Sequence, residues 1–295
     1  SSRLLEKCGR KTRYIATDEE NSLTLGIEAA LEALRRANIT GKEIDLLIFS
    51  SQTPEFLVPM NSLAIHRAID GSRGMINFDL NANCIGMFLS IEQAVYTLQN
   101  NPRVERALVI GSDELSFLSN ENSTLTYSIF GDAAVALVLK KDPSNESGML
   151  GIMHETDSEN YDEIVYPVGG MKRLMKERRP HEGVYWGRFD GVDSVAFAER
   201  SIHSLLEENG LTLDDISLFC FSQFTLNNII ALKASLGISS EKISYVGDRY
   251  GYTGTNSPFL AFYEALEEGR VKRGDYIIFW TLGAGYETAT MLWKY

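Results

Sequence analysis

The sequence repeats one local pattern at a long interval, and this repeat constrains the fold more than any other feature. Ile44 and Ser50 bound an apolar run that follows a helical segment and a polar turn, and Ile216 and Ser222 bound a second run in the same setting. Each residue of the second pair lies 172 residues after its counterpart in the first. This interval is too long for a stacked-repeat protein. It predicts two copies of one α/β unit within the chain.

Most runs expected to form strands are apolar along their whole length, which is typical of parallel strands buried on both faces and covered by helices. The expected strands cover residues 46–49, 75–78, 107–110, 134–139, 218–221, 276–279 and 288–293. The expected helices cover residues 21–38, 61–69, 87–98, 195–209, 227–236 and 257–268. Two sheets related by an approximate two-fold axis would enclose their inner helices. We place the boundary between an N-terminal half (1–140) and a C-terminal half (141–295) in a polar bridge.

Composition excludes several classes of protein. Hydrophobic residues make up 44% of the 295-residue chain and the net charge is −12, which suits a sizeable core and argues against a nucleic-acid-binding surface. No apolar run reaches the length of a membrane span, and no signal segment is expected at the start of the sequence. Cys8, Cys84 and Cys220 are far apart and form no CxxC pair, so neither a disulfide framework nor a metal site is expected. A reducing, cytoplasmic setting fits these features best.

One cysteine has a distinctive position within this pattern. Cys84 follows the expected strand at 75–78 and precedes the expected helix at 87–98. The N-terminal end of a helix carries partial positive charge, which lowers the pKa of a nearby thiol and favours the nucleophilic thiolate. A small buried side chain in the core is the alternative interpretation of a lone cysteine. The internal repeat favours the reactive interpretation, because it places Cys84 where the two halves meet, beside the loop 251–257 that begins the second inner helix.

The segment around this cysteine matches a known motif. Asp79–Met87 resembles the nucleophile segment of β-ketoacyl-acyl-carrier-protein synthase III and its relatives in the thiolase superfamily. Further stretches resemble other motifs of that family in the same order along the chain, at residues 9–16, 53–59, 130–134, 247–258 and 281–286. Together they span nearly the whole sequence. The resemblance implies a thiolase-like fold in which two duplicated α/β halves form a layered α-β-α-β-α sandwich, with a first strand that would precede Ser1.

The resemblance also implies a two-step acyl transfer. An acyl group would pass from coenzyme A or an acyl carrier protein to Cys84, and the backbone N–H groups of Cys84 and Gly285 would hold the carbonyl oxygen as it becomes anionic. In the family the second substrate is usually a malonyl thioester, which loses carbon dioxide and attacks the acyl group. No metal or resident cofactor is implied, since the coenzyme A or phosphopantetheine thioester is a substrate. The protein would act as a homodimer, or as a heterodimer with a paralogue.

The sequence departs from the family at the two side chains that serve the second step. Ser222 stands where the family has a histidine, in a motif of which Gln223 is retained, and Tyr252 stands where the family has an asparagine. We expect the Ser222 and Tyr252 hydroxyls to serve as catalytic hydrogen-bond donors, although hydroxyls are poor acids near neutral pH. Gln52 lies about where the related hydroxymethylglutaryl-CoA synthases carry a glutamate base, and its amide would orient a substrate instead. These departures affect decarboxylation and spare the acyl-accepting step.

A further set of residues is expected to bind the substrate. The candidates are Lys7 and Arg10, which would meet a coenzyme A phosphate; Val58, which would face the acyl pocket of the partner subunit; and Met87, Gln223, Thr225 and His154, which would border the chain's own pocket. A histidine on a strand edge or on the surface is the alternative interpretation of His154.

These features predict an acyltransferase of the synthase III type, which loads Cys84 and passes the acyl group to a carbon, oxygen or nitrogen acceptor. The sequence lacks both the histidine and the asparagine that the family uses in the second step. This loss also fits a different function, that of a non-catalytic subunit which partners an active ketosynthase in a heterodimer. Hydrolysis of the thioester by water is a third and weaker alternative. The retained Cys84 favours the enzyme over the silent partner.

Overall fold

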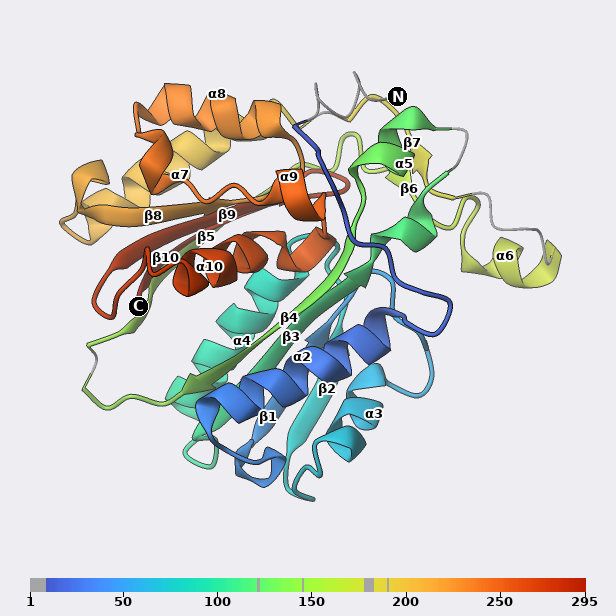
Figure 1. The fold of residues 1–295 in the computed structure, drawn as a ribbon, viewed down its shortest axis with the longest axis horizontal. Coiled ribbons are helices and arrows are strands. Elements are labelled where there is room, and N and C mark those ends of the chain that lie inside the picture. The colour runs from blue at the N-terminus through green and yellow to red at the C-terminus, as the bar shows by residue number, and fades with distance from the viewer. Residues whose placement is uncertain (1–8, 121–122, 145, 178–182, 190) are drawn as a thin grey trace.

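The chain forms two layered halves that meet through a central pair of helices. The computed structural model describes residues 9–120, 123–144, 146–177, 183–189 and 191–295. Each half contains a four-stranded mixed sheet, and helices cover both faces of each sheet, so that the layers follow the order α-β-α-β-α (Figure 1). This arrangement confirms the thiolase-like sandwich expected from the sequence.

The first sheet belongs to the N-terminal half and has its parallel strands together. In spatial order the strands are β2 (Ile76–Leu80), β1 (Leu46–Ser50), β3 (Arg106–Glu114) and β4 (Asp132–Lys140). β1 pairs in parallel with β2 and β3, and β4 runs antiparallel to β3. Ser50 is in register with Leu80 on one side and Gly111 on the other. The polar residues that follow these strand ends therefore converge at one edge of the sheet.

The second sheet repeats this design in the C-terminal half. In spatial order its strands are β5 (Gly148–Thr156), β10 (Glu287–Lys294), β9 (Tyr276–Gly283) and β8 (Ile216–Phe221). β8 pairs in parallel with β9, and β10 runs antiparallel to both β9 and β5. β8, β9 and β10 thus repeat the pairing of β1, β3 and β4. The boundary expected after residue 140 falls between β4 and β5, and no strand is shared between the two sheets in the described ranges.

Helices form the inner and outer layers (Figure 1). The inner layer consists of α4 (Gly86–Asn100) and α10 (Ser257–Glu267), one from each half. The outer layers consist of α2 (Ser22–Ala37) and α3 (Asn61–Ala68) on the first sheet, and of α7 (Ser194–Glu208) and α8 (Leu226–Leu236) on the second. The shorter helices α5 (Thr124–Ile129) and α9 (Gly247–Tyr250) precede β4 and α10. Among the described residues, none of the helices combines the length and the apolar character needed to cross a membrane.

The direction of alternate side chains along the strands explains these layers. Leu46 and Ile48 of β1 pack with the inner helices, whereas Leu47 and Phe49 pack with α2 and α3, and all four side chains are buried. β8 divides its side chains between the inner layer and the outer layer in the same way. A strand that is buried on both faces must be apolar at successive positions, which is the pattern that the sequence shows.

The turns before β1 and β8 repeat the same hydrogen bonds. Thr40 and Glu43 form a capping box before β1, and Thr212 and Asp215 form the equivalent box before β8. In each box the carboxylate accepts a hydrogen bond from the threonine backbone N–H at 2.8 Å. Such reciprocal bonds satisfy backbone groups that a short helical turn leaves without partners. The internal repeat therefore extends from the order of the elements to their local capping.

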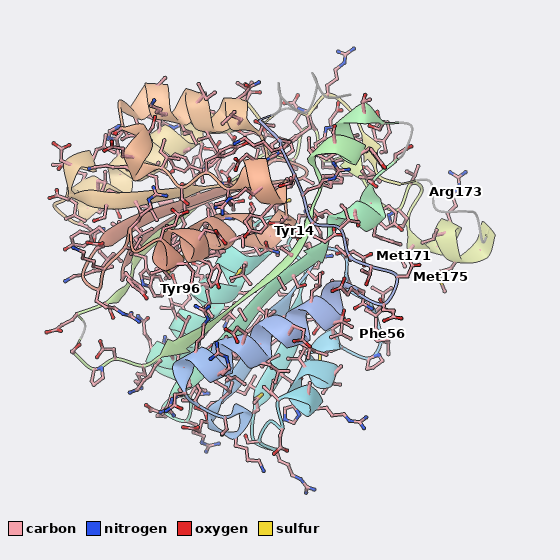
Figure 2. All side chains as sticks on the ribbon, in the orientation of Figure 1. Tyr14, Phe56, Tyr96, Met171, Arg173 and Met175 are labelled. Carbon is pink, nitrogen blue, oxygen red and sulfur yellow. The ribbon has the colours of Figure 1, made fainter. Side chains whose placement is uncertain are left out.

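The segment between β5 and α7 carries structure that the hydrophobic pattern does not predict. Its elements are the hairpin of β6 (Ile164–Val165) and β7 (Tyr185–Trp186) and the helix α6 (Met171–Glu177). α6 projects from the body of the molecule and exposes Met171 and Met175 (Figure 2). The hairpin instead packs on the body, and the Val184 N–H donates to the Leu118 carbonyl at 2.9 Å. β5 was also outside the expected strands, because glycines interrupt its apolar run.

Shortening Phe88 tests the inner helix layer. The Phe88 ring is fully buried and its centroid lies 5.1 Å from that of Phe259 on α10. Phe88→Ala should therefore lower the free energy of unfolding by about 3–5 kcal/mol, measured by urea denaturation. Tyr96→Ala on the same helix is the matched control, because Tyr96 is 47% exposed (Figure 2) and its loss should change the free energy by about 0.5 kcal/mol or less. Equal losses in the two variants would contradict the inner position of α4.

Candidate active site

Cys84 lies in the tight turn that joins β2 to α4. The preceding residue, Asn83, has a φ of +49°, so the chain reverses direction directly before the cysteine. α4 then begins at Gly86, where a Cβ atom would lie 2.3 Å from the Ser50 Oγ. A glycine is therefore required for the helix to begin this close to β1.

Hydrogen bonds from the C-terminal half hold the start of α4. The Met87 N–H donates to the Thr255 Oγ1 at 2.7 Å, which joins the first turn of α4 to the loop that begins α10. The Thr281 hydroxyl of β9 donates to the Cys84 carbonyl at 3.5 Å. Cys84 therefore lies between the two halves, as the internal repeat predicted.

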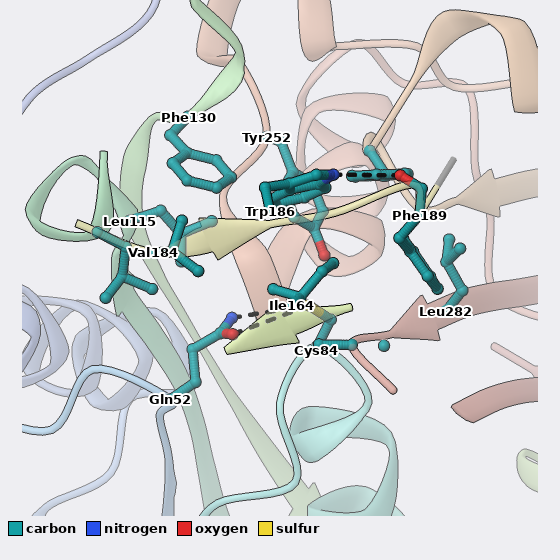
Figure 3. A pocket seen from close by; sticks show the side chains of 14 residues that line it. Gln52, Cys84, Leu115, Phe130, Ile164, Val184, Trp186, Phe189, Tyr252 and Leu282 are labelled. Carbon is teal, nitrogen blue, oxygen red and sulfur yellow. Dashed lines mark hydrogen bonds between the residues drawn. The ribbon is translucent and has the colours of Figure 1, made fainter. Parts of the chain in front are cut away.

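An apolar pocket lies next to Cys84 (Figure 3). Both halves and the β6–β7 hairpin contribute to its walls, and its cavity measures about 40 Å³. The described residues that line it include no Asp, Glu, Lys, Arg or His. Trp186 stacks on Phe224 with ring centroids 5.6 Å apart, and Phe224 meets Tyr252 edge-on at 5.4 Å. Sequence reasoning missed Trp186 and Phe224, because no local pattern brings such distant aromatic residues together.

Hydrogen-bond donors approach the Cys84 sulfur from several directions. The Gln52 Nε2 lies 3.7 Å from the sulfur, and the Tyr252 hydroxyl points toward it from another side (Figure 3). The Ala284 backbone is a third donor. Each of these groups would stabilise negative charge on the sulfur, and none of them carries a charge itself.

Burial nevertheless keeps the thiol protonated. Loss of water raises the pKa of Cys84 to about 11, although hydrogen bonds from Tyr252, Gln52 and the Ala284 backbone act in the opposite direction. The carboxylate of Asp113 adds to the rise by repelling a thiolate. The lowered pKa that the sequence led us to expect is therefore wrong, because desolvation outweighs the hydrogen bonds that the sulfur receives.

Tyr252 and Ser222 occupy the two positions at which the sequence departs from the family. Tyr252 lines the pocket, and Ser222 is fully buried directly after β8. Burial raises the pKa of Tyr252 well above its ordinary value, and the neighbouring Cys84 and Asp113 add to the rise, whereas the nearby Ser222 hydroxyl acts against it. Tyr252 is thus suited to donate a hydrogen bond rather than a proton. Among the described residues the Ser222 hydroxyl has no partner at normal hydrogen-bond geometry, so its catalytic role stays a prediction.

Asp113 is a site residue that sequence reasoning missed. Its fully buried carboxylate lies near the end of β3 and accepts hydrogen bonds from the Gln52 backbone N–H at 2.8 Å and the Gln52 Nε2 at 3.0 Å. Burial raises the pKa of Asp113 to about 6, and its hydrogen bonds limit the rise. A signal was present in the sequence, since Asp113 follows an expected apolar strand at the sheet edge where α/β proteins bind their ligands.

The turn between β9 and β10 presents Ala284 to the sulfur, one residue before the expected Gly285. A Cβ atom at Gly283 would lie 3.7 Å from the Cys84 backbone nitrogen, which shows how closely the two turns approach. Gly285 has a φ of +80° and faces Tyr161 instead, and it is not among the residues that line the pocket. The role of Gly285 as an oxyanion donor stays a prediction.

The structure corrects the roles expected for Arg10 and Gln223. Arg10 is 4% exposed and donates to the Gln223 carbonyl at 2.5 Å and the Phe224 carbonyl at 3.0 Å. The Gln223 side chain accepts hydrogen bonds from the Val246 and Gly247 N–H groups, both at 2.9 Å. These polar groups hold the chain after β8 and do not line the pocket. Contacts of Arg10 with a phosphate and of Gln223 with a substrate are therefore wrong for this arrangement.

Three other binding candidates also have contacts away from the pocket lining. The His154 Nε2 lies 3.0 Å from the Glu92 Oε2, which joins β5 to α4. Met87 is fully buried and packs on β3. The Thr225 Oγ1 accepts the Asn228 N–H at 3.2 Å and caps α8. His154, Met87 and Thr225 thus connect elements of the fold, and their contact with a substrate stays a prediction.

The last two candidates remain predictions. Val58 is 89% exposed in the loop before α3 and is not among the residues that line the chain's own pocket, so a contact with a partner subunit is untested. Lys7 lies outside the described residues. Within the described ranges, no group of three or more His, Cys, Asp and Glu side chains is placed to hold a metal ion.

Removing the Tyr252 hydroxyl tests its action on the thiol. Tyr252→Phe keeps the ring but removes the donor, so the pKa of Cys84 should rise further above about 11. A hydrogen bond to a charged group contributes about 1.5–3 kcal/mol, and iodoacetamide labelling of Cys84 at pH 9 should therefore slow by roughly tenfold or more. Peptide mass mapping separates Cys84 from the other cysteines. Tyr250→Phe is the control, because the Tyr250 hydroxyl donates to Glu264 at 2.8 Å; an unchanged rate in Tyr252→Phe would refute the assignment.

Comparison with known proteins agrees with the site and the fold. Models of 3-oxoacyl-[acyl-carrier-protein] synthase III and of its C-terminal part match residues 78–158 and 206–295, which contain Cys84 and Tyr252. The β-ketoacyl-[acyl-carrier-protein] synthase III of Symbiobacterium thermophilum is 31% identical over 284 residues, which cover 95% of this chain and 85% of the relative. That of Solibacter usitatus is 29% identical over 298 residues, which cover 99% and 89%.

Solved structures show the same relationship. The crystal structure of 3-oxoacyl-[acyl-carrier-protein] synthase III from Aquifex aeolicus has a TM-score of 0.87 and 27% identity, over 100% of this chain and 91% of that one. The matches extend across both halves and include the nucleophile turn. The chain therefore belongs to the β-ketoacyl-acyl-carrier-protein synthase III family of the thiolase superfamily.

Proposed function

We propose that the protein is an acyltransferase of the 3-oxoacyl-acyl-carrier-protein synthase III type, in which Cys84 accepts an acyl group from a thioester and passes it to an acceptor. The donor would be acyl coenzyme A or an acyl carrier protein, of which the names of the relatives print the carrier protein. The observation that carries the proposal is the position of Cys84 beside an uncharged pocket, with donors around its sulfur.

The loading step balances without a separate base. The Cys84 sulfur forms a bond to the thioester carbonyl carbon, the bond from that carbon to the donor sulfur breaks, and the thiol proton moves to the departing sulfur. This route suits a thiol with a pKa of about 11, because the proton leaves only as the new bond forms. Tyr252 and Gln52 would stabilise the partial negative charge that the sulfur carries as its proton leaves and before the new bond is complete.

Decarboxylative condensation has weaker support from the same pocket. The described residues that line it include neither a histidine nor an asparagine, and each missing oxyanion donor costs about 3–4 kcal/mol of transition-state stabilisation. Loss of the histidine also removes the side chain best suited to move a proton near neutral pH. Transfer to an oxygen, a nitrogen or an already activated carbon therefore fits this site better than attack by a malonyl thioester.

The pocket also limits the acyl group. Its cavity of about 40 Å³ is far smaller than the roughly 150 Å³ of an engineered cavity that binds benzene. A two-carbon group is the size that fits without rearrangement. Longer chains would require Trp186 and Phe224 to leave their stacked arrangement.

Incubation with acetyl coenzyme A tests the loading step. Intact-mass measurement should show one acetyl group on the wild type and none on Cys84→Ala, because the sulfur is the acceptor. Octanoyl coenzyme A should load more slowly by roughly tenfold or more, since its chain exceeds the cavity.

Two outcomes would contradict this function. Wild type without an adduct from any acyl thioester, or an equal adduct on Cys84→Ala, would reject Cys84 as the acyl acceptor. Rapid release of carbon dioxide from malonyl coenzyme A by the acetylated protein would instead restore the condensing reaction that we place second.

A non-catalytic subunit is the second candidate function. The loss of the family's histidine and asparagine together favours it, and so does the raised pKa of Cys84, about 11, which is not that of an activated nucleophile. In this role the protein would shape the pocket or the carrier surface of an active ketosynthase. Co-purification with such a paralogue, together with the absence of loading on the isolated chain, would select this function over the first.

We also propose a dimer formed through the outer edge of the first sheet. β2 is one of the two outer strands of that sheet, and Ile76 at its start is 42% exposed. Leu57 and Val58 in the loop before α3 are 70% and 89% exposed. Exposed apolar side chains beside an open strand edge are suited to cover by a second copy of the chain. Val58 would then approach the pocket of the partner.

A charged substitution at this edge tests the dimer. The wild type should sediment as a dimer in analytical ultracentrifugation, and Ile76→Glu should weaken the association by about tenfold or more, because it would bury an unpaired charge. Ile230→Glu is the matched control, since Ile230 is 54% exposed on α8, in the other half of the chain. A monomeric wild type, or equal effects of the two substitutions, would refute the proposed interface.

A further inference from the structure

Asp113 is a buried carboxylate surrounded by neutral partners. In the described part of the chain it accepts hydrogen bonds from the Ser51 Oγ at 3.2 Å, the Thr255 N–H at 2.8 Å, and both the backbone and side chain of Gln52. No Lys, Arg or His of the described ranges forms an ion pair with it. Burying a carboxylate without a cation costs free energy. Packing alone therefore does not explain this residue.

The neighbouring backbone is shaped to admit the carboxylate. Gly254 has a φ of +71°, and a Cβ atom there would lie 2.1 Å from the Asp113 Oδ2 and 2.9 Å from the Gln52 Nε2. Glycine leaves this space open and also permits the positive φ. The loop before α10, the carboxylate and the glutamine amide therefore pack as one unit.

Gln52 connects this unit to the nucleophile. Its Nε2 lies 3.0 Å from the Asp113 Oδ2 and 3.7 Å from the Cys84 Sγ, and its Oε1 lies 4.0 Å from the same sulfur (Figure 3). An ionised carboxylate only accepts hydrogen bonds, so the amide must turn its NH₂ group toward Asp113. The second N–H of that nitrogen is then available to the sulfur.

We propose that Asp113 is a positioning residue, which orients the Gln52 side chain so that its NH₂ group serves the sulfur of Cys84. This proposal rests on the proposed role of Cys84 as an acyl acceptor. With the amide reversed, the carbonyl oxygen would occupy the place of the NH₂ group and repel the negative charge that gathers on the sulfur during acyl transfer. Asp113 itself neither touches the substrate nor takes a proton in the loading step.

The side-chain NH₂ signals of glutamine provide a direct test. The chain has four glutamines, Gln52, Gln93, Gln99 and Gln223, so ¹⁵N labelling of glutamine alone gives a simple NMR spectrum. Gln52→Met assigns the signal of interest. In the wild type this signal should shift with a midpoint near pH 6, which is about the pKa that burial gives Asp113. A signal that does not titrate would overturn the proposal.

Nearby titratable groups define the control. Cys84 and Tyr252 also face Gln52, but burial raises the pKa of Cys84 to about 11 and that of Tyr252 well above its ordinary value. Glu114, the next residue on β3, has its pKa raised to about 7 by burial and by Asp132 and Glu55. Glu114→Gln should leave the midpoint of the Gln52 signal unchanged. If the pH titration of the Gln52 signal disappears in Glu114→Gln but persists in Asp113→Asn, the titration does not belong to Asp113 and the proposal is overturned.

Alkylation of Cys84 by iodoacetamide gives a second test that needs no thioester. The apparent pKa of the thiol is measured between pH 8 and pH 11, where Asp113 is ionised, in wild type, Gln52→Met, Asp113→Asn and the double variant. Removing the carboxylate relieves repulsion and lowers the thiol pKa, whereas releasing Gln52 raises it. Asp113→Asn should therefore accelerate alkylation more in the Gln52→Met background than in the wild type, by about threefold or more.

Comparing the wild-type and Gln52→Met backgrounds distinguishes orientation of Gln52 by Asp113 from direct repulsion between the Asp113 charge and the sulfur. Equal acceleration in both would show that Asp113 acts on the sulfur only through its field, and would overturn its action through Gln52. Unequal acceleration in a protein that accepts no acyl group would reject the acyltransferase function but retain the coupling between Asp113, Gln52 and Cys84. If Asp113→Asn does not fold, a wild-type Gln52 signal that does not titrate near pH 6 still overturns the proposal.

Discussion

The burial of Cys84 between two duplicated halves is the constraint on which the rest of the site depends. The hydrogen bond from the Met87 N–H to Thr255 fixes the start of α4 against the loop before α10. Cys84 and Tyr252 consequently line the same pocket. Water is excluded from the sulfur as a result. A low local dielectric strengthens each hydrogen bond to a developing charge, but it also disfavours that charge in the resting protein. Burial therefore strengthens the hydrogen bonds that the sulfur receives and, at the same time, makes the thiol less acidic.

The layered fold was predictable because local patterns encode it twice. A strand such as Leu46–Ser50 is apolar at nearly every position, and α2 begins after an Asn21 cap and is followed by Asn38 in the left-handed conformation. Two copies of such a unit bury both faces of their sheets only by sharing an inner helix layer. The hairpin of Ile164–Val165 and Tyr185–Trp186 was not predictable in this way, because two-residue strands carry no hydrophobic period.

The site residues divide according to how far away their partners lie in the sequence. Cys84 lies two residues before the start of α4, so local pattern was enough to place it. Arg10 bonds to a carbonyl 213 residues away and His154 pairs with a carboxylate 62 residues away, and no local signal indicates that these groups already have partners within the protein. Asp113 differs from these residues, because its sequence position indicates only a polar residue after an apolar strand. Its role in the site becomes evident from the packing of Gln52 and Gly254 around its carboxylate.

A pocket with neutral donors distinguishes between reactions by the charge that each brings in. The proposed loading of Cys84 would move a proton from one sulfur to another, so the net charge of the pocket would not change. A malonyl thioester would carry a carboxylate into a pocket whose described lining has no cation, near an Asp113 that is itself negative above a pKa of about 6. Desolvation and repulsion both oppose that step. Under the proposed function, the replacement of the family's histidine and asparagine by Ser222 and Tyr252 would act in the same direction, since neutral hydroxyls add no cation to hold an anionic second substrate.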